Sequence, residues 1–249
     1  HRKGDIKMTY QNNFKRYEKK YLIDEKQYRD LIALIYCKLE YDRYKKYKIC
    51  NIYFDTPQFD LIRESIEKPL YKEKLRLRSY GTPDSEDFVF LEIKKKFDGI
   101  VYKRRISLPY RQAVDYCING NLPETHNQIT NEIDWLMSKY QLYPMLYLSY
   151  DRLAMRGIED PELRITFDSN IIWRVNQLDM TKGDFGNVKM PSGQYIMEIK
   201  TNGAMPLWLS GALNELAIYP KSFSKYGTIY KEELFQNMLL EEGGFCCVE

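Results

Sequence analysis

Histidine and paired cysteines are scarce in this 249-residue chain, and their scarcity excludes several kinds of site. The two histidines, His1 and His126, lie far apart in the sequence, which nearly excludes a Ser-His-Asp or Cys-His mechanism and a histidine-rich metal site. The cysteines are odd in number and form no C-x-x-C motif, so neither a zinc site nor a disulfide framework is indicated. They are Cys37, Cys50, Cys117, Cys246 and Cys247. We therefore expect a reducing, cytoplasmic location.

Long apolar runs are missing as well. No stretch of 18 apolar residues predicts a transmembrane helix, and no signal-peptide core is visible. A hydrophobic content of 44% with 29% charged residues is typical of a globular protein, and the net charge of +3 is too small to identify a partner. Because the sequence contains no repeats and no breaks in composition, we expect one domain over 14–242. A polar leader or expression remnant is expected at 1–13, and a tail at 243–249.

Charged and aliphatic residues alternate with a period of two in five short stretches, and most of the charges are positive. Because side chains of a strand point alternately to opposite faces, each stretch predicts a strand with a charged face and an aliphatic face. The stretches are Arg16–Tyr21, Lys74–Arg78, Glu92–Lys96, Leu163–Asp168 and Glu198–Lys200. Several such strands in one domain indicate a shared sheet whose charged face meets an anion.

The remaining pattern predicts an α+β domain with eight or more mainly antiparallel strands. Expected strands cover 14–23, 49–55, 74–80, 88–108 as a hairpin, 145–152, 163–168, 171–175 and 195–200. One helix is expected directly after Asp24. Further helices are expected over 56–68, 109–119, 128–140, 206–218 and 231–242, and a loop is expected at 220–227.

The hairpin is expected to turn at Asp98-Gly99, a strong hairpin dipeptide. A two-residue turn pairs Phe97 with Ile100 and places Lys94 opposite Lys103. Two facing lysines repel each other. Either the register differs, or an anion lies between them.

A solvated outer face is the ordinary explanation for charge on an antiparallel sheet. Two observations favour an enclosed face instead: Arg and Lys recur although strands disfavour Lys, and the predicted helices need an apolar surface to cover. We therefore expect helices over Leu75, Leu77, Ile93, Ile165 and Ile199, and charges lining a lumen. The cations of this face are Arg16, Lys20, Lys74, Arg76, Arg78, Lys94, Lys96, Lys103, Arg105, Arg152, Arg164 and Lys200. Its acids are Glu18, Glu92, Asp168 and Glu198.

The order of these motifs resembles the VTC domain, the catalytic domain of the vacuolar transporter chaperone polyphosphate polymerase, which has many bacterial relatives and belongs to the CYTH-like triphosphate tunnel metalloenzymes. The resemblance runs from about residue 14 to 230. The matching motifs are Arg16-Tyr17-Glu18-x-Lys20-Tyr21, Tyr53-Phe54-Asp55-Thr56, Lys74-Leu75-Arg76-Leu77-Arg78, Leu91-Glu92-Ile93-Lys94, Lys103-Arg104-Arg105, Tyr150-Asp151-Arg152, Leu163–Asp168, Met197-Glu198-Ile199-Lys200 and Ser224-Lys225-Tyr226.

This resemblance implies an eight-stranded antiparallel closed barrel, the triphosphate tunnel, with flanking helices. It implies a polymerase that transfers the γ-phosphate of ATP to polyphosphate, with Mn²⁺ or Mg²⁺ as cofactor. The residues acting on the transferred phosphate would be Arg76, Arg78, Arg152, Arg164 and Lys225. Those binding the rest of the nucleotide or chain would be Lys20, Lys74, Lys94, Lys103, Arg105, Lys200 and Arg16. The metal ligand would be Glu198, with Glu18 and Glu92 as further candidates.

One position departs from the related simple triphosphatases, whose first strand carries Glu-x-Glu-x-Lys: here Arg16 replaces the first Glu. This substitution favours the polymerase branch over a two-metal hydrolytic site. A triphosphatase, and a non-catalytic module that binds polyphosphate or nucleotide, stay as alternatives. Glu198 has an alternative too, as an ion-pair partner of the neighbouring cations. The expected partners are ATP, triphosphate or polyphosphate. Nucleic acid is not expected, because no motif combines stacking aromatics with Arg or Lys.

Overall fold

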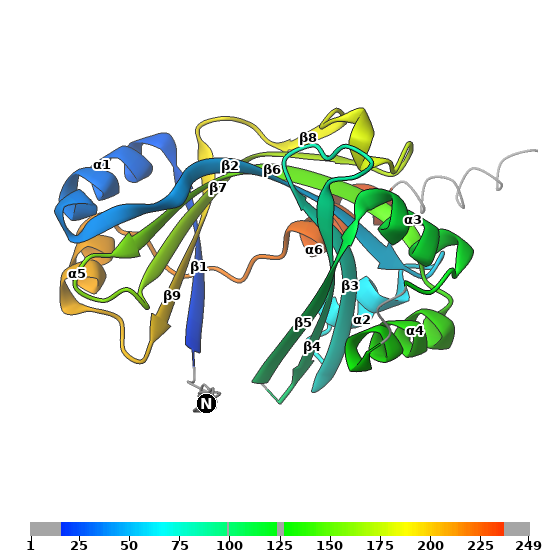
Figure 1. The fold of residues 1–249 in the computed structure, drawn as a ribbon. Coiled ribbons are helices and arrows are strands. Elements are labelled where there is room, and N and C mark those ends of the chain that lie inside the picture. Colours follow the sequence, from blue (N-terminus) through cyan, green and yellow to red (C-terminus); the bar gives the residue numbers. More distant parts are fainter. Residues whose placement is uncertain (1–15, 99, 124–126, 237–249) are drawn as a thin grey trace, which may run out of the picture.

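The computed structural model describes residues 16–98, 100–123 and 127–236, which form an α+β domain around one strongly curved antiparallel sheet. The strands pair in the order β1-β9-β7-β6-β2-β3-β4-β5, and β8 pairs with β7. Their bounds are β1 Arg16–Asp24, β2 Leu39–Asp55, β3 Tyr71–Tyr80, β4 Phe88–Phe97, β5 Ile100–Pro109, β6 Tyr143–Gly157, β7 Arg164–Arg174, β8 Asn187–Met190 and β9 Gln194–Asn202. The sheet forms an arch whose two arms end in β1 and β5 (Figure 1).

Helices cover the convex face of each arm (Figure 1). The helices on this face are α1 Glu25–Ile35, α3 Tyr110–Asn119, α4 Gln128–Tyr140 and α5 Leu207–Glu215. Two further helices, α2 Asp60–Ile66 and α6 Lys225–Ile229, contribute to a cluster on the concave side. Short 3-10 turns lie at Tyr36–Lys38 and Met180–Lys182, and a π-helical turn, Tyr230–Leu234, extends α6. Helices α1 and α5 pack on β1, β7 and β9, whereas α3 and α4 pack on β2 to β5.

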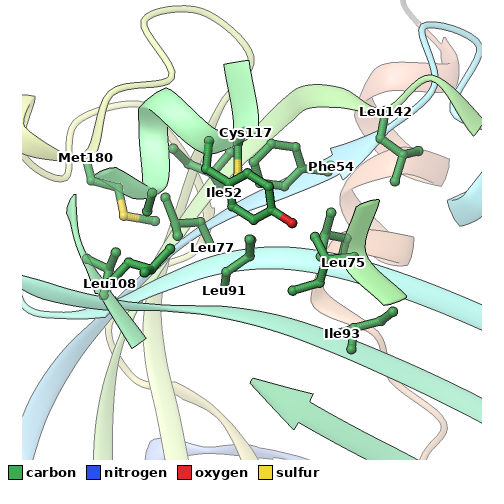
Figure 2. Close-up of a cluster of buried hydrophobic side chains, with 14 of the residues drawn as sticks. Ile52, Phe54, Leu75, Leu77, Leu91, Ile93, Leu108, Cys117, Leu142 and Met180 are labelled. Atoms are coloured by element: carbon green, nitrogen blue, oxygen red, sulfur yellow. The ribbon is translucent and has the colours of Figure 1, made fainter. Parts of the chain in front are cut away.

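The aliphatic sides of the alternating strands form the core, as expected. Leu75, Leu77 and Ile93 are buried against α3 and α4, in the cluster that Figure 2 shows. Ile165 and Ile199 are buried against α1 and α5. The period-two pattern therefore correctly predicted which face of these strands the helices cover, and it leaves the charged side chains on the concave face.

The expected closed barrel is not confirmed, because the sheet of the described residues stays open. Strands β1 and β5 are the two ends of the strand order and are not paired with each other. One contact at the edge of β1 is part of the reason: the amide of Lys221 donates to the carbonyl of Lys20, so this carbonyl is not available to a strand of the other arm. Charges of both signs act between the arms, since burial and Lys20 of β1 lower the pKa of Lys94 on β4 whereas Glu18 of β1 raises it.

The segment 219–224 crosses the concave side from α5 to α6 (Figure 1). The amide of Lys221 donates a backbone hydrogen bond to the carbonyl of Lys20 on β1. On the other arm, the Tyr226 hydroxyl donates to the carboxylate of Asp55 at the end of β2. We call residues 219–224 the crossing segment. Together with α2 and the π-helical turn, α6 packs on apolar side chains of β2, β6 and β7, so this part of the concave side is core.

Several element boundaries differ from expectation. The second strand begins at Leu39 instead of residue 49, because its first half pairs with β6 although it carries few apolar residues. The helix expected from residue 56 begins at Asp60, since the buried carboxylate of Asp55 accepts hydrogen bonds from the amides of Leu61 and Ile62. The helix expected from residue 231 begins at Lys225, where the Ser224 hydroxyl accepts from the amide of Gly227. Strand β8 was not expected, and β7 is one continuous strand.

None of the helices in the described ranges is both long and apolar enough to cross a membrane. Segments 1–13 and 243–249, expected to flank the domain, lie outside the described residues, so this division stays a prediction.

Candidate phosphate-binding site

The concave face of the arch carries charged and polar side chains from β1, β9, β7, β6, β2, β3, β4 and β5, and α6 adds Lys225. Because alternate residues of these strands enter the apolar core on the other face, the intervening charged residues are directed to the same side. The ion pairs fall into three groups, one on the β3–β5 arm, one at the centre of the sheet and one on the β1–β9 arm.

The first group is built around Glu92 on β4, whose side chain is only 1% exposed. Its Oε2 lies 2.8 Å from Nη2 of Arg76, and its Oε1 lies 2.7 Å from Nζ of Lys103. Burial raises the pKa of Glu92, but the charges of Arg76, Arg78 and Lys103 outweigh burial and lower that pKa to about 2. Glu92 is thus an ionised counter-charge that orients three cations.

Polar groups of β2 hold the two arginines of β3 in place. Arg78 donates from Nε to Oδ1 of Asn51 over 3.0 Å, and Arg76 donates from Nη1 to the hydroxyl of Tyr53 over 3.3 Å. Burial raises the pKa of Tyr53, yet Arg76 and Arg78 together bring it down to about 8. This lowered pKa shows that the local field is strongly positive even with Glu92 ionised.

The second group is centred on Asp168 of β7, which the sequence placed on the charged face without giving it a role. Arg152 donates from Nε and Nη2 to the two carboxylate oxygens over 2.6 and 2.7 Å, and Nζ of Lys225 lies 2.6 Å from Oδ2. Burial raises the pKa of Asp168, but Lys225 and Arg152 lower it to about 2. The ring of Tyr150 lies under both cations, 4.4 Å from Nζ of Lys225.

The third group joins β9 and β1. Glu198 lies 2.7 Å from Nζ of Lys200 and 3.8 Å from Nζ of Lys20, and Glu18 lies 3.9 and 3.6 Å from the same two nitrogens. Burial raises the pKa of Glu198, whereas Lys200, Lys20 and Arg152 bring it down to about 2. Lys20 also donates to the carbonyl of Phe223 in the crossing segment.

These two carboxylates are the acidic pair that could hold a divalent cation. The structure brings Glu18 and Glu198 together but keeps Glu92 in a separate group, and no group of three or more His, Cys, Asp or Glu suited to a metal occurs within the described residues. One or two carboxylates completed by phosphate oxygens is the donor set that Mg²⁺ and similar hard cations use. The pair therefore fits a metal ion whose remaining ligands come from a bound phosphate. It does not fit a metal ion that is coordinated by protein ligands alone.

Three lysines stand side by side on adjacent strands. In the β4–β5 ladder Lys94 pairs with Lys103, and in the β3–β4 ladder it pairs with Lys74. The two-residue turn and register expected from the sequence are thus confirmed. Burial and neighbouring cations lower the pKa of Lys74 to about 8 and also lower the pKa of Lys94. The register therefore does not separate these three positions, although Lys103 is ion-paired with Glu92 and Lys94 is exposed. We call Lys74, Lys94 and Lys103 the lysine row.

Three predicted residues lie outside these groups. Arg164, at the start of β7, has a half-exposed side chain that pairs with Asp42 of β2. The guanidinium of Arg105 stacks over the ring of Phe90, 4.3 Å from its centroid. Arg16 pairs through its backbone with Asn202, and its predicted phosphate contact lies outside what the structure describes.

Solved structures with the same fold come from distant organisms. A candidate adenylate cyclase from Bacillus halodurans is 16% identical, with a TM-score of 0.52 over 83% of this chain and 92% of that one. A candidate adenylyl cyclase from Hippeastrum, described as having a dominant triphosphatase activity, is 17% identical, with a TM-score of 0.50 over 86% of this chain and 94% of that one. At these identities the likeness concerns the fold.

No curated protein sequence matches the chain significantly. The model of the VTC domain family does match, over residues 15–232. This match spans all the charged strands and Lys225, so it confirms the resemblance drawn from the order of the motifs. The chain belongs to the VTC domain family and shares the fold of the CYTH-like triphosphate tunnel proteins.

Proposed function

We propose that this protein is a metal-dependent polyphosphate polymerase, which transfers the γ-phosphate of ATP to the end of a polyphosphate chain on the concave face of the arch. The lysine row is the observation that carries this proposal. Glu92 pairs with Lys103, which leaves the positive charge of Lys74 and Lys94 on the adjacent strands without a carboxylate in an ion pair among the described residues. A chain of phosphates offers one negative group after another at close spacing and would offset this charge.

The protein's own residues would perform three tasks. Arg76, held by Glu92 and Tyr53, and Arg152, held by Asp168, present guanidinium groups that suit bidentate binding of phosphate oxygens. The lysine row neutralises the incoming chain. Phosphoryl transfer requires positioning and charge stabilisation above all, so no side-chain nucleophile is needed. A terminal phosphate oxygen of the chain attacks the γ-phosphorus, the bond to the β-phosphate oxygen breaks, and ADP leaves.

Glu198 and Glu18 would hold the metal, for which we propose Mn²⁺ or Mg²⁺. When bound, such a cation supplies positive charge to the phosphate oxygens. In its absence the two carboxylates are neutralised by Lys20 and Lys200. Metal binding would thus release these ammonium groups to contact phosphate.

Triphosphate hydrolysis is the second candidate, because one protein of the same fold is described as having a dominant triphosphatase activity. Water would then take the place of the chain end. Membership of the VTC domain family and the Arg at position 16 favour the polymerase.

Incubation with ATP and Mn²⁺ or Mg²⁺ separates these activities. A polymerase yields acid-labile chains that form a ladder on a gel, together with equimolar ADP. Free phosphate without a ladder would identify a triphosphatase, and binding of ATP without turnover would identify a non-catalytic module. The Arg76→Ala variant and a metal-free reaction are the controls.

A further inference from the structure

Large apolar side chains are exposed at the end of the β3–β5 arm where β4 turns into β5. Figure 1 shows this end of the arm. Leu70 is 64% exposed, Phe97 50%, Ile100 56% and Trp135 of α4 53%. Tyr71 and Tyr102 are also exposed. We call these six residues the arm-end patch. Side chains of this size gathered at one protruding end are unusual for a surface in contact with water alone.

The backbone register explains why these residues gather. Tyr71, Phe97 and Ile100 are direct partners across β3, β4 and β5. They alternate with Lys72 and Lys96, so they project from the convex face, opposite to the lysine row. Tyr102 pairs with Lys95, whose ammonium lies 5.9 Å from the ring of Trp135. Lys95 therefore lies between the residues at the turn and Trp135 of α4, and the apolar members of the patch project away from the concave site.

Charges of both signs lie near the patch. The exposed cations beside it are Lys68 and Lys139, and Lys72 and Lys96 project from the opposite face of the same arm end. Lys95 and Arg104 are paired with Glu73 or Glu132, Glu64 is close enough to raise the pKa of Lys139, and Asp98 is exposed at the turn. Burial together with the charges of Lys96, Lys94 and Lys68 lowers the pKa of Lys72, which shows that the cations at this end are only partly neutralised.

We propose that the arm-end patch inserts into the interface of an anionic lipid membrane. Aromatic residues with an apolar body and a polar tip suit the headgroup region, and Phe97 and Ile100 at the turn suit the adjoining acyl chains. The lysines around them would attract acidic lipid headgroups. A second copy of this chain is a less suitable occupant, since its own cations would meet those of the first. This inference does not depend on the proposed function.

Sedimentation with vesicles tests the proposal. The wild-type protein should bind vesicles of phosphatidylcholine with phosphatidylserine, bind pure phosphatidylcholine at least tenfold more weakly, and lose affinity as salt rises. Tryptophan fluorescence should shift to shorter wavelength on binding, because Trp135 leaves water. The Phe97→Ser/Ile100→Ser double variant should bind at least tenfold more weakly while ATP turnover is unchanged, since neither side chain faces the concave site.

Leu207→Ser is the matched control, because Leu207 is an exposed apolar residue at the start of α5 and should leave vesicle binding unchanged. The proposal is overturned if the wild type does not bind the anionic vesicles, or if the double variant binds them as well as the wild type. It is equally overturned if the wild type forms a dimer in ultracentrifugation that the double variant loses, because the patch would then be a protein interface.

Discussion

Lys94 lies directly opposite Lys103 in the β4–β5 ladder, and the same residue lies opposite Lys74 in the β3–β4 ladder. Within the described part of the chain, no ion pair or hydrogen bond links the ammonium groups of Lys74 and Lys94 to a carboxylate. Glu92 neutralises Lys103, which leaves the row with excess positive charge. This excess of positive charge is the reason why we propose the row as an anion-binding site.

Replacing Lys94 by Ala should weaken binding of tripolyphosphate and leave the empty protein at least as stable as before. A charge-assisted contact contributes about 1.5–3 kcal/mol, which corresponds to about tenfold or more in affinity. Isothermal titration calorimetry and thermal melting of the ligand-free variant measure the two effects. Lys182→Ala, at an exposed lysine far from the row, is the control. Unchanged affinity in Lys94→Ala would exclude this lysine from the anion site.

Arg76→Ala and Arg164→Ala should differ in stability. Removing Arg76 leaves the buried Glu92 with fewer partners, so we expect a loss of about 1–3 kcal/mol in unfolding free energy. Arg164 is half exposed, and its loss should change stability by less than about 1 kcal/mol. Denaturant titration at neutral pH checks both values. Equal stability of the two variants would show that Glu92 does not depend on Arg76.

Acid should destabilise the fold through Asp168 and Glu92. Their pKa values are about 2 in the folded protein, below their ordinary values of 3.8 and 4.5. Because the folded state binds these protons more weakly than the unfolded chain, the stabilisation is complete above pH 4.5 and is lost as the pH falls towards 2. Unfolding free energies measured between pH 6 and 2 should show this decline. The Asp168→Asn variant should have a lower unfolding free energy at pH 6 and lose less of it as the pH falls. If its unfolding free energy falls with pH as steeply as that of the wild type, Asp168 does not contribute to the acid destabilisation.

Phosphate binding should weaken as the pH rises from 7 to 9.5. Lys74, whose pKa is about 8, loses its positive charge in this range, and Tyr53, also at about 8, gains a negative one. Both changes disfavour an anion on the concave face. Calorimetry with tripolyphosphate at several pH values should show the decline, reduced in Lys74→Met and in Tyr53→Phe. A pH-independent affinity would show that neither group titrates near the bound phosphate.

Glu198→Gln should abolish metal-dependent turnover and leave binding of metal-free phosphate intact or stronger, since the amide keeps the shape of the side chain and removes its negative charge. Metal-dependent turnover and metal-free calorimetry separate these effects. Glu86→Gln, at an exposed acid on the surface, is the control. Normal turnover of Glu198→Gln at limiting Mn²⁺ would show that Glu198 is only an ion-pair partner of Lys200 and Lys20.

The sequence predicted the parts of this molecule that local rules determine. Period-two alternation identified the buried faces of Leu75 and Ile165, and Asp98-Gly99 gave the register that aligns Lys94 with Lys103. Alternation could not predict the early part of β2, because Tyr41–Lys48 contains no apolar repeat and depends on pairing with β6.

Contacts between residues that are far apart in the chain could not be predicted from the sequence. Whether β1 meets β5 depends on contacts between arms that are far apart in the chain, and in the described residues these two strands do not pair, so the expected closed barrel is not confirmed. The grouping of the carboxylates has the same origin. Asp168 pairs with Lys225, which lies 57 residues further along the chain. Glu92 lies on β4, in the opposite arm of the sheet from Glu18 on β1 and Glu198 on β9. Neither the period-two alternation nor any short motif determines how far apart these side chains lie in the folded protein.

An open sheet leaves two strand edges at which another chain could add by backbone hydrogen bonding and start aggregation. The β1 edge is partly blocked by the amide of Lys221, which already occupies the carbonyl of Lys20. On β5, Lys103, Arg104 and Arg105 form a run of three cations that repels a second edge of the same kind. The charge that keeps two such edges apart therefore includes Lys103 of the proposed anion site, and a polyanion bound there would also weaken the repulsion between molecules.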